Sequence, residues 1–386
     1  MSRYDVIIVG LGAMGSAALH QLAKRDVRVL GIDRFAPPHE QGSSHGDTRI
    51  TRLAIGEGAH YTPLVKRSHE IWREIERETG ADLLTQCGEL IISSKNRKSS
   101  IHVDGFFQNT VDAACVHGIA HELLDASQIR ARYPQFNIRD EEMGYFEAEA
   151  GFSRPEACID AQLSLAKKHG AEIRMGETVL DFEPRANGVT VKTDRGVYQA
   201  DKLVVAAGAW LPKFLGGDFG KLLKVYRQVL SWFAVDGDVA AYEPKRFPVF
   251  IWELPDSPQG IYGFPAIDGG LKVATEQYAA TTSPDRVDRS VSAEEIEHMH
   301  RNYVAPYLKG VTSKCLKAKA CLYTVTPDAG FILDTLPSSD RVIVASCCSG
   351  HGFKHSAAIG EALADKAEGL AGSLDLSPFR LGRFSA

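Results

Sequence analysis

Hydrophobic residues near the start of the chain form two short runs, separated by a glycine-rich turn and an amphipathic segment. Residues 4–9 are rich in valine and isoleucine, which is typical of a buried parallel strand. Residues 13–24 carry their apolar side chains on one helical face, and residues 27–32 form the second run. The pattern predicts a strand–helix–strand unit over residues 1–34.

Helix signals recur further along the chain. Residues 62–80 repeat apolar positions at helical spacing, with Thr62 as the expected cap and Gly80 as the expected stop. Two Ser-x-x-Glu sequences, at 153–156 and 292–295, predict capping boxes that open two more helices.

Other segments alternate apolar and polar positions, as strands do. Residues 89–93 predict one strand, and Asn187-Gly188 and residues 194–196 are typical hairpin turns. Residues 225–280 are rich in aromatic side chains at alternating positions, which predicts an antiparallel sheet. Residues 341–345 predict a strand that leads through a glycine-rich turn into a final helix.

The composition argues against several classes of protein. A length of 386 residues suits two domains, and a hydrophobic fraction of 44% supports a sizeable core. The net charge of -5 provides no basic surplus for binding nucleic acid or an anionic membrane, and no apolar stretch approaches the ~20 residues that span a bilayer. The seven cysteines are odd in number and lack CxxC spacing, so we expect no disulfide framework and no metal site, and a reducing cytoplasm fits best.

The glycine-rich turn has the spacing of a dinucleotide-binding fingerprint. Gly10, Gly12 and Gly15 follow a predicted strand and open a predicted helix, and Asp33 ends the next strand. The glycines permit a tight turn and a close approach to pyrophosphate, while Asp33 accepts hydrogen bonds from ribose and disfavours NADP. The motif alone leaves FAD and NAD open. The candidate cofactor contacts in this unit are Gly10, Gly12, Ala13, Met14, Gly15, Asp33 and Arg34.

Three further segments carry a family resemblance. They are residues 42–50 (GSSHGDTRI) with Arg52 and Glu57 following, residues 320–324 (ACLYT), and residues 349–354 (SGHGFK). Together with the fingerprint, their order and spacing resemble the family of monomeric sarcosine oxidase and N-methyltryptophan oxidase. The resemblance implies an FAD-dependent amine oxidase.

The expected fold class is α/β. The resemblance implies a glutathione-reductase-like, Rossmann-type FAD-binding domain and a second domain built on a mixed or antiparallel β-sheet. We expect the FAD-binding domain to be discontinuous, with residues 1–82, 151–215 and 318–386, and the second domain to comprise residues 83–150 and 216–317.

The resemblance also implies that FAD is held covalently, through a cysteine bonded to the 8α-methyl group of the flavin. The matching residue is Cys321. Without the resemblance, a buried, unreactive cysteine would be the simpler interpretation. The other cofactor contacts that the resemblance implies are Ser43, Ser44, His45, Thr48, Arg49, Gly208, Gly350, His351, Gly352, Phe353 and Lys354.

The same resemblance suggests roles in catalysis. Arg52 and Lys354 are expected to bind the substrate carboxylate, with Lys354 one turn inside a helix, and Lys272 matches a lysine that promotes the reaction of reduced flavin with oxygen. His45 and Arg49 match residues close to the flavin ring. Tyr262 and Tyr323 match aromatic residues beside the substrate. Solvent-exposed charges and core tyrosines are the alternative interpretation of these residues.

Glu276 departs from the family pattern, because sarcosine oxidases place an active-site histidine at this position. A carboxylate would repel an anionic substrate unless it pairs with a cation or with the substrate amine. Glu276 could also recruit a more basic substrate, so the identity of the amine stays open.

The sequence therefore predicts an oxidase of a small secondary amino acid, such as an N-methyl amino acid or a cyclic imino acid. It would release an imine that hydrolyses and would reduce O2 to H2O2. The alternatives are an FAD-dependent dehydrogenase that passes electrons to a quinone or protein carrier, a flavin-binding module without catalysis, and an NAD-dependent dehydrogenase. The resemblance suggests a monomer.

Overall fold

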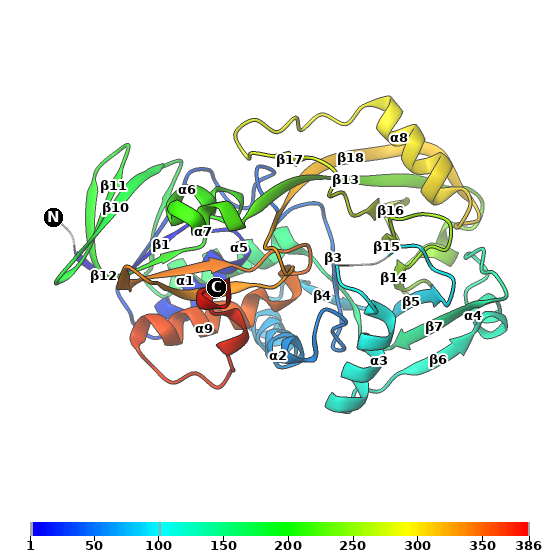
Figure 1. Ribbon diagram of the computed structural model, residues 1–386, viewed down its shortest axis with the longest axis horizontal. Helices are drawn as coiled ribbons and strands as arrows, with labels where there is room; N and C mark the ends of the chain where they lie inside the picture. The colour runs from blue at the N-terminus through cyan, green and yellow to red at the C-terminus, as the bar shows by residue number, and fades with distance from the viewer. Residues whose placement is uncertain (1–2, 100–101, 385–386) are drawn as a thin grey trace.

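The computed structural model describes residues 3–99 and 102–384, which form two large β-sheets with a small sheet between them (Figure 1). The predicted strand–helix–strand unit is confirmed as β1 (Arg3–Val9), α1 (Ala13–Ala23) and β2 (Val29–Asp33), with β1 and β2 parallel.

The first sheet has a parallel core extended by antiparallel strands. Its central order is β9 (Glu172–Met175), β2, β1 and β12 (Val197–Val205), and β12 also pairs in parallel with β20 (Ser339–Ser346). The remaining strands are β10 (Val179–Arg185), β11 (Gly188–Thr193) and β19 (Ile332–Leu336). The two hairpin turns predicted at Asn187-Gly188 and at residues 194–196 are confirmed, because they join β10 to β11 and β11 to β12.

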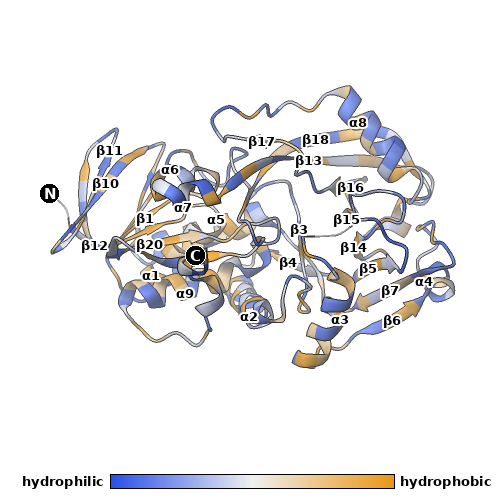
Figure 2. Ribbon diagram, in the orientation of Figure 1, coloured by the Kyte–Doolittle hydropathy of each residue, from blue (hydrophilic) through white to orange (hydrophobic). Residues whose placement is uncertain are grey.

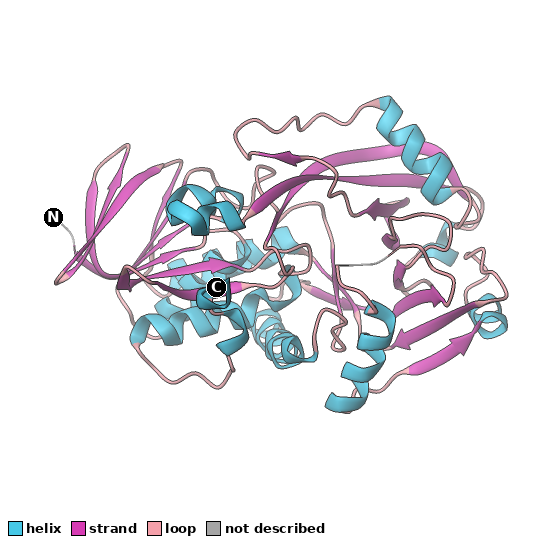
Figure 3. Cartoon of the chain, in the orientation of Figure 1, coloured by secondary structure: helices cyan, strands magenta, loops and turns pink. Residues whose placement is uncertain are grey.

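Helices cover one face of this sheet (Figure 3). These are α1, α2 (Thr62–Thr79), α5 (Pro155–Lys168) and α9 (Ser356–Glu368). Their apolar faces and the sheet share a core, and Gly360 of α9 permits a close approach to α1, because a Cβ there would lie 2.3 Å from Ala17 Cβ. Figure 2 shows the hydrophobic residues concentrated on β1 and β20, inside this layer, whereas the outer helix α8 (Ala293–Met299) is largely hydrophilic.

The second large sheet has nine strands and is mostly antiparallel, as predicted for residues 225–280, with one parallel pair between β5 and β14. Its strands are β5 (Glu89–Ser94), β6 (Glu122–Asp125), β7 (Glu142–Glu147), β13 (Lys224–Val235), β14 (Val249–Trp252), β15 (Ile261–Ile267), β16 (Gly270–Thr275), β17 (Thr281–Thr282) and β18 (Val311–Val325). The other α-helices are α3 (Phe106–His117), α4 (Ala126–Arg132), α6 (Leu211–Leu215) and α7 (Gly217–Leu222).

Two features link the large sheets. The small sheet, β3 (Arg49–Thr51), β8 (Gly151–Ser153) and β4 (Leu84–Gln86), lies between them (Figure 1). Residues 318–325, assigned from the sequence to the FAD-binding segments, form the end of β18 and pair with β13 in the second sheet. The division into two discontinuous domains stays a prediction.

Two predicted caps are wrong. The hydroxyl of Thr62 donates to the carbonyl of Leu53 and does not cap α2, which is preceded by Tyr61. Glu156 forms no capping box with Ser153, because its carboxylate accepts hydrogen bonds from the backbone N–H groups of Gly46 and Asp47. The capping box at residues 292–295 is confirmed at the start of α8.

No helix among the described residues is both long and apolar enough for a membrane span.

Candidate active site

The glycine-rich turn is built as a cradle at the carboxyl end of β1. A Cβ at Gly10 would lie 2.5 Å from Ala206 O, and one at Gly15 would lie 1.7 Å from Gly10 O, so both positions require glycine. A Cβ at Gly12 would meet only Ser44 Oγ, at 3.6 Å, so the space in front of this residue is open. Asp33 accepts a hydrogen bond of 2.7 Å from the Leu11 N–H, which fixes its carboxylate at the edge of the turn.

An elongated cavity begins at this turn. It has an empty volume of about 1250 Å³ and includes Asp33, the exposed side chain of Arg34, and Gly208. A second cavity of about 850 Å³ extends it between the two large sheets. The two cavities share the residues Ala13, Met14, Ser43, Ser44, Cys347 and Cys348. This continuous space, which begins at the predicted phosphate-binding turn and includes the carboxylate predicted to bind ribose, is compatible with FAD.

Two substitutions in the cradle separate folding from cofactor binding. We expect Gly15→Ala to lower the free energy of unfolding by about 1–3 kcal/mol, because its Cβ overlaps the Gly10 carbonyl. We expect Gly12→Ala to change unfolding of the apoprotein by less than about 1 kcal/mol while weakening FAD binding, because its Cβ occupies the open space. Thermal unfolding and titration with FAD measure the two effects. Equal losses of stability in both variants would contradict this interpretation of the turn.

Arg49 and Lys272 lie in the second cavity, held by backbone oxygen atoms of the loop that precedes β3. Arg49 donates to the carbonyls of Ser43, His45 and Thr48. Lys272 Nζ lies 2.8 Å from Gly46 O and from Thr48 O, and its side chain is 2% exposed. Burial and the neighbouring Arg49 lower the pKa of Lys272 well below its usual value.

Arg52 and Lys354 face the same cavity and share one carboxylate. Arg52 Nη2 lies 2.8 Å from Glu57 Oε2, and Lys354 Nζ lies 3.7 Å from Glu57 Oε1. Burial alone would raise the pKa of Glu57, but Arg52 and Lys354 together lower it well below its usual value. Arg52 Nε has no hydrogen-bond partner among the described residues, so this N–H group is available to donate to an anionic ligand.

Lys354 lies in a helical segment, but before the first residue of α9 and not one turn inside the helix as predicted. Residues Phe353–His355 form a 3₁₀ turn that precedes α9, and Lys354 Nζ donates to His351 O at 2.7 Å. The short turn directs the ammonium back into the cavity, toward Glu57.

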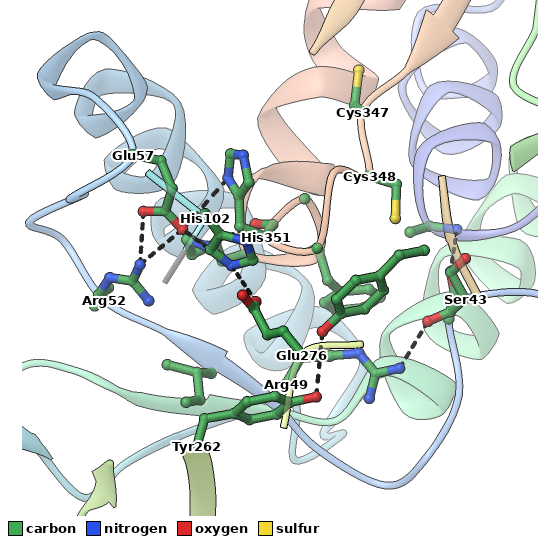
Figure 4. A pocket seen from close by; sticks show the side chains of 18 of the residues that line it. Ser43, Arg49, Arg52, Glu57, His102, Tyr262, Glu276, Cys347, Cys348 and His351 are labelled. Carbon is green, nitrogen blue, oxygen red and sulfur yellow. Dashed lines mark hydrogen bonds and ion pairs between the residues drawn. The ribbon is translucent and has the colours of Figure 1, made fainter. Parts of the chain in front are cut away.

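Glu276 is placed directly after β16 and lines the same cavity. Its partner is His102, in the loop between β5 and α3, with Nε2 2.9 Å from Glu276 Oε1 (Figure 4). His102 and the buried Glu89, whose Oε1 lies 3.6 Å from Arg52 Nη1, are site residues that sequence reasoning missed. The sequence indicated Glu89 only by placing an acidic residue at the start of the strand predicted for residues 89–93.

The tyrosines and the candidate flavin-linking cysteine lie on strands of the second sheet. The hydroxyls of Tyr262 and Tyr323 lie 3.3 Å apart, and both residues line the second cavity. Cys321 is 3% exposed and lies behind the wall, opposite Gln228 of β13. Burial raises the pKa of its thiol, against the opposing effects of Arg49 and Lys272.

The remaining predicted contacts lie in three different places. Gly350, His351, Gly352 and Phe353 line the second cavity. Thr48 lines a third, smaller cavity that also contains Lys272. His45 is buried beside the same loop without lining these cavities, and burial lowers its pKa to about 3, so its ring is neutral near pH 7. No group of metal-binding side chains occurs within residues 3–99 and 102–384.

Comparison with known proteins shows which family the chain belongs to. The family model described as "FAD dependent oxidoreductase" matches residues 5–366. The monomeric sarcosine oxidase of Streptomyces avermitilis is 40% identical over 370 residues, covering 94% of this chain and 93% of that protein. The N-methyl-L-tryptophan oxidase of Salmonella newport is 36% identical over 390 residues, covering 99% and 100%.

Solved structures share the fold. NikD, described as an unusual amino acid oxidase essential for nikkomycin biosynthesis, superposes with a TM-score of 0.84 at 23% identity and covers 98% of each chain. Glycine oxidase from Geobacillus kaustophilus gives a TM-score of 0.78 at 21% identity, covering 100% of each chain. The predicted fold class is confirmed, and the chain belongs to the family of FAD-dependent oxidoreductases.

Proposed function

We propose that this protein is an FAD-dependent oxidase of a small secondary amino acid. The observation that carries the proposal is the placement of Arg52 and Lys354 in one cavity that continues into the dinucleotide cradle. A guanidinium and an ammonium held close together bind a carboxylate through charge-assisted hydrogen bonds. The names of the full-length relatives, which are oxidases of sarcosine and of N-methyl-L-tryptophan, support the same substrate class.

The residues of the chain position the substrate. Arg52 and Lys354 hold the carboxylate, and the walls formed by Ile251, Tyr262 and Phe264 exclude water from the carbon and nitrogen that react. The buried cations favour the neutral amine, which is the form with a lone pair. When bound, FAD supplies the two-electron oxidation of the C–N bond, and water then hydrolyses the released imine.

We infer that Lys272 assists the transfer of electrons to oxygen, which yields hydrogen peroxide. Its ammonium has three oxygen acceptors in the loop and packs 4.3 Å from the centre of the Phe264 ring. A fixed cation stabilises the negative charge that develops as oxygen is reduced.

We also infer that FAD is held covalently through Cys321, by a thioether between Sγ and the flavin 8α carbon. Formation of this bond would remove one hydrogen from the thiol and one from the flavin methyl group, and oxygen would be the oxidant that takes up both as hydrogen peroxide. The support is the match of Cys321 to the cysteine of the related oxidases and its position beside Arg49 and Lys272.

The proposal includes a monomer located in the cytoplasm, in keeping with seven free thiols. Light scattering of the purified protein tests the oligomeric state.

A peroxide assay across a panel of secondary amino acids tests the function. The panel contains sarcosine, N-methyl-L-tryptophan, another N-methyl amino acid and a cyclic imino acid. Peroxide formed with at least one of them, and abolished by Arg52→Ala together with Lys354→Ala, supports the proposal. Activity on primary amino acids alone would contradict it.

The affinity of the site for carboxylates should depend on pH. Burial lowers the pKa of Lys354 to about 8, so its ammonium is present below pH 8 and lost above it. Burial raises the pKa of Glu89 to about 8. When Glu89 ionises beside Arg52 as the pH rises, its negative charge also weakens the binding of a carboxylate. The dissociation constant of propanoate, read from flavin absorbance, should rise about tenfold between pH 7 and 9.

Two variants separate the contributions to this effect. Lys354→Met should raise the constant at pH 7 and remove most of its pH dependence, whereas Glu89→Gln should retain the part that Lys354 produces. A constant that is independent of pH in the wild-type protein would contradict the assignment of Lys354 as a carboxylate ligand.

A further inference from the structure

Glu276 and His102 form a pair beside the proposed carboxylate site, and His102 Nε2 also lies 3.8 Å from Glu57 Oε1. Both side chains are 7% exposed and both line the cavity that contains Arg52 and Lys354. In Figure 4 the Glu276 carboxylate projects into the middle of the cavity, where His102 meets it from the opposite wall. The cavity therefore contains an anionic group in addition to its cationic end.

His102 is fixed from several directions. Its Nδ1 lies 3.4 Å from the hydroxyl of Tyr278, while its Nε2 meets Glu276. A Cβ at Gly350 would lie 2.5 Å from His102 Cε1, and the φ of Gly350 is +83°, so the glycine both adopts this backbone conformation and makes room for the imidazole. The ring is held in one place and, in turn, orients the carboxylate of Glu276.

Glu276 is not needed to neutralise the cations of the cavity. Glu57 already faces both Arg52 and Lys354, and Glu89 lies behind Arg52. Within the described residues, His102 Nε2 is the one basic nitrogen within 4 Å of the Glu276 carboxylate, and Tyr278 also interacts with this carboxylate. Burying a carboxylate is costly unless charged or hydrogen-bonding groups compensate it, so a ligand group of opposite charge would find a prepared partner.

We propose that Glu276, positioned by His102, recognises a cationic group on the side chain of the substrate. The substrate class is then a secondary α-amino acid with a basic side chain, a refinement that rests on the proposed oxidase function. Arg52 and Lys354 hold the carboxylate, the apolar wall at Ile251 and Phe264 accommodates the hydrocarbon part, and Glu276 accepts hydrogen bonds from the distal cation.

Two substrates that differ mainly in the terminal charge test the proposal. Nα-methyl-L-lysine and N-methyl-L-norleucine share a linear hydrocarbon chain, and only the first ends in an ammonium. We expect the wild-type protein to favour the lysine derivative in kcat/KM by about tenfold or more, as a charge-assisted hydrogen bond allows. Glu276→Gln should reduce this ratio about tenfold while changing kcat/KM for the norleucine derivative much less. His102→Gln should reduce the ratio to a smaller extent.

Binding provides a readout that requires neither turnover nor a variant. Straight-chain carboxylates of four to six carbons, ending either in an amino group or in a methyl group, are titrated into the wild-type holoenzyme and followed by flavin absorbance. At least one amino-terminated ligand should bind about tenfold more tightly than its methyl-terminated partner.

The outcomes are distinguishable. Equal kcat/KM for the two substrates together with equal affinity for the paired ligands would overturn the recognition by Glu276 and leave the oxidase function intact. A ratio that Glu276→Gln does not alter would also overturn it. Preferential binding of the amino-terminated ligands without oxidation of any secondary amine would support the recognition and count against the proposed oxidase.

Discussion

The substitution Cys321→Ala should release all flavin into the supernatant when the holoenzyme is precipitated with acid, whereas the wild-type pellet should stay yellow. A thioether survives denaturation, and non-covalent contacts do not. The Cys321 side chain lies 3% exposed on β18, behind the wall of the second cavity, so alanine removes a thiol without disturbing an ion pair.

Cys348→Ala is the matched control for this experiment. Cys348 lines both cavities and is less buried than Cys321, but the resemblance indicates Cys321 as the linking residue. The flavin of the Cys348→Ala protein should remain in the pellet. Release from Cys348→Ala with retention in Cys321→Ala would move the linkage to Cys348, and release from the wild-type protein would remove the covalent link altogether.

The substitution Lys272→Met should slow reoxidation of the reduced flavin by about 10²–10³-fold, the range typical of removing one electrostatic contact at a developing charge. Reduction by substrate should change much less, because the proposed ligands of the substrate carboxylate are Arg52 and Lys354. Rapid mixing of pre-reduced enzyme with oxygen separates the two half-reactions. Since burial lowers the pKa of Lys272, the wild-type rate should also fall as pH rises through that pKa.

Lys317→Met is the control, because Lys317 lies 4.7 Å from the centre of the same Trp232 ring that Lys272 approaches at 5.3 Å. Lys317 is part of the third cavity with Lys272 but does not line the second, and it pairs with Asp47. Its loss should leave reoxidation nearly unchanged. Similar slowing in both variants would indicate a general field effect and contradict a specific role for Lys272.

Local sequence patterns predicted the parts of the site that depend on short segments. Gly10, Gly12 and Gly15 define their turn within six residues, so the turn could be predicted from their spacing alone. The resemblance to known oxidases identified Arg52 and Lys354, which the structure brings into one cavity although they lie far apart in sequence.

Tertiary contacts account for what the sequence did not predict. Glu156 matched a capping box, but two N–H groups of the loop at residues 46 and 47 use its carboxylate instead. His102 follows no motif, and its partner Glu276 comes from a strand end more than 170 residues away. Pairings of this kind depend on how β5 and β16 are arranged within one sheet, which local periodicity does not encode.

Anaerobic mixing of the purified holoenzyme with an N-methyl amino acid, followed by admission of air, tests the central claim most directly. The visible absorbance of the flavin should bleach with the substrate, return with oxygen, and yield one peroxide for each imine formed. No bleaching by any secondary amino acid would contradict the claim. A bleached flavin that stays reduced in air but transfers electrons to a dye would instead identify a dehydrogenase.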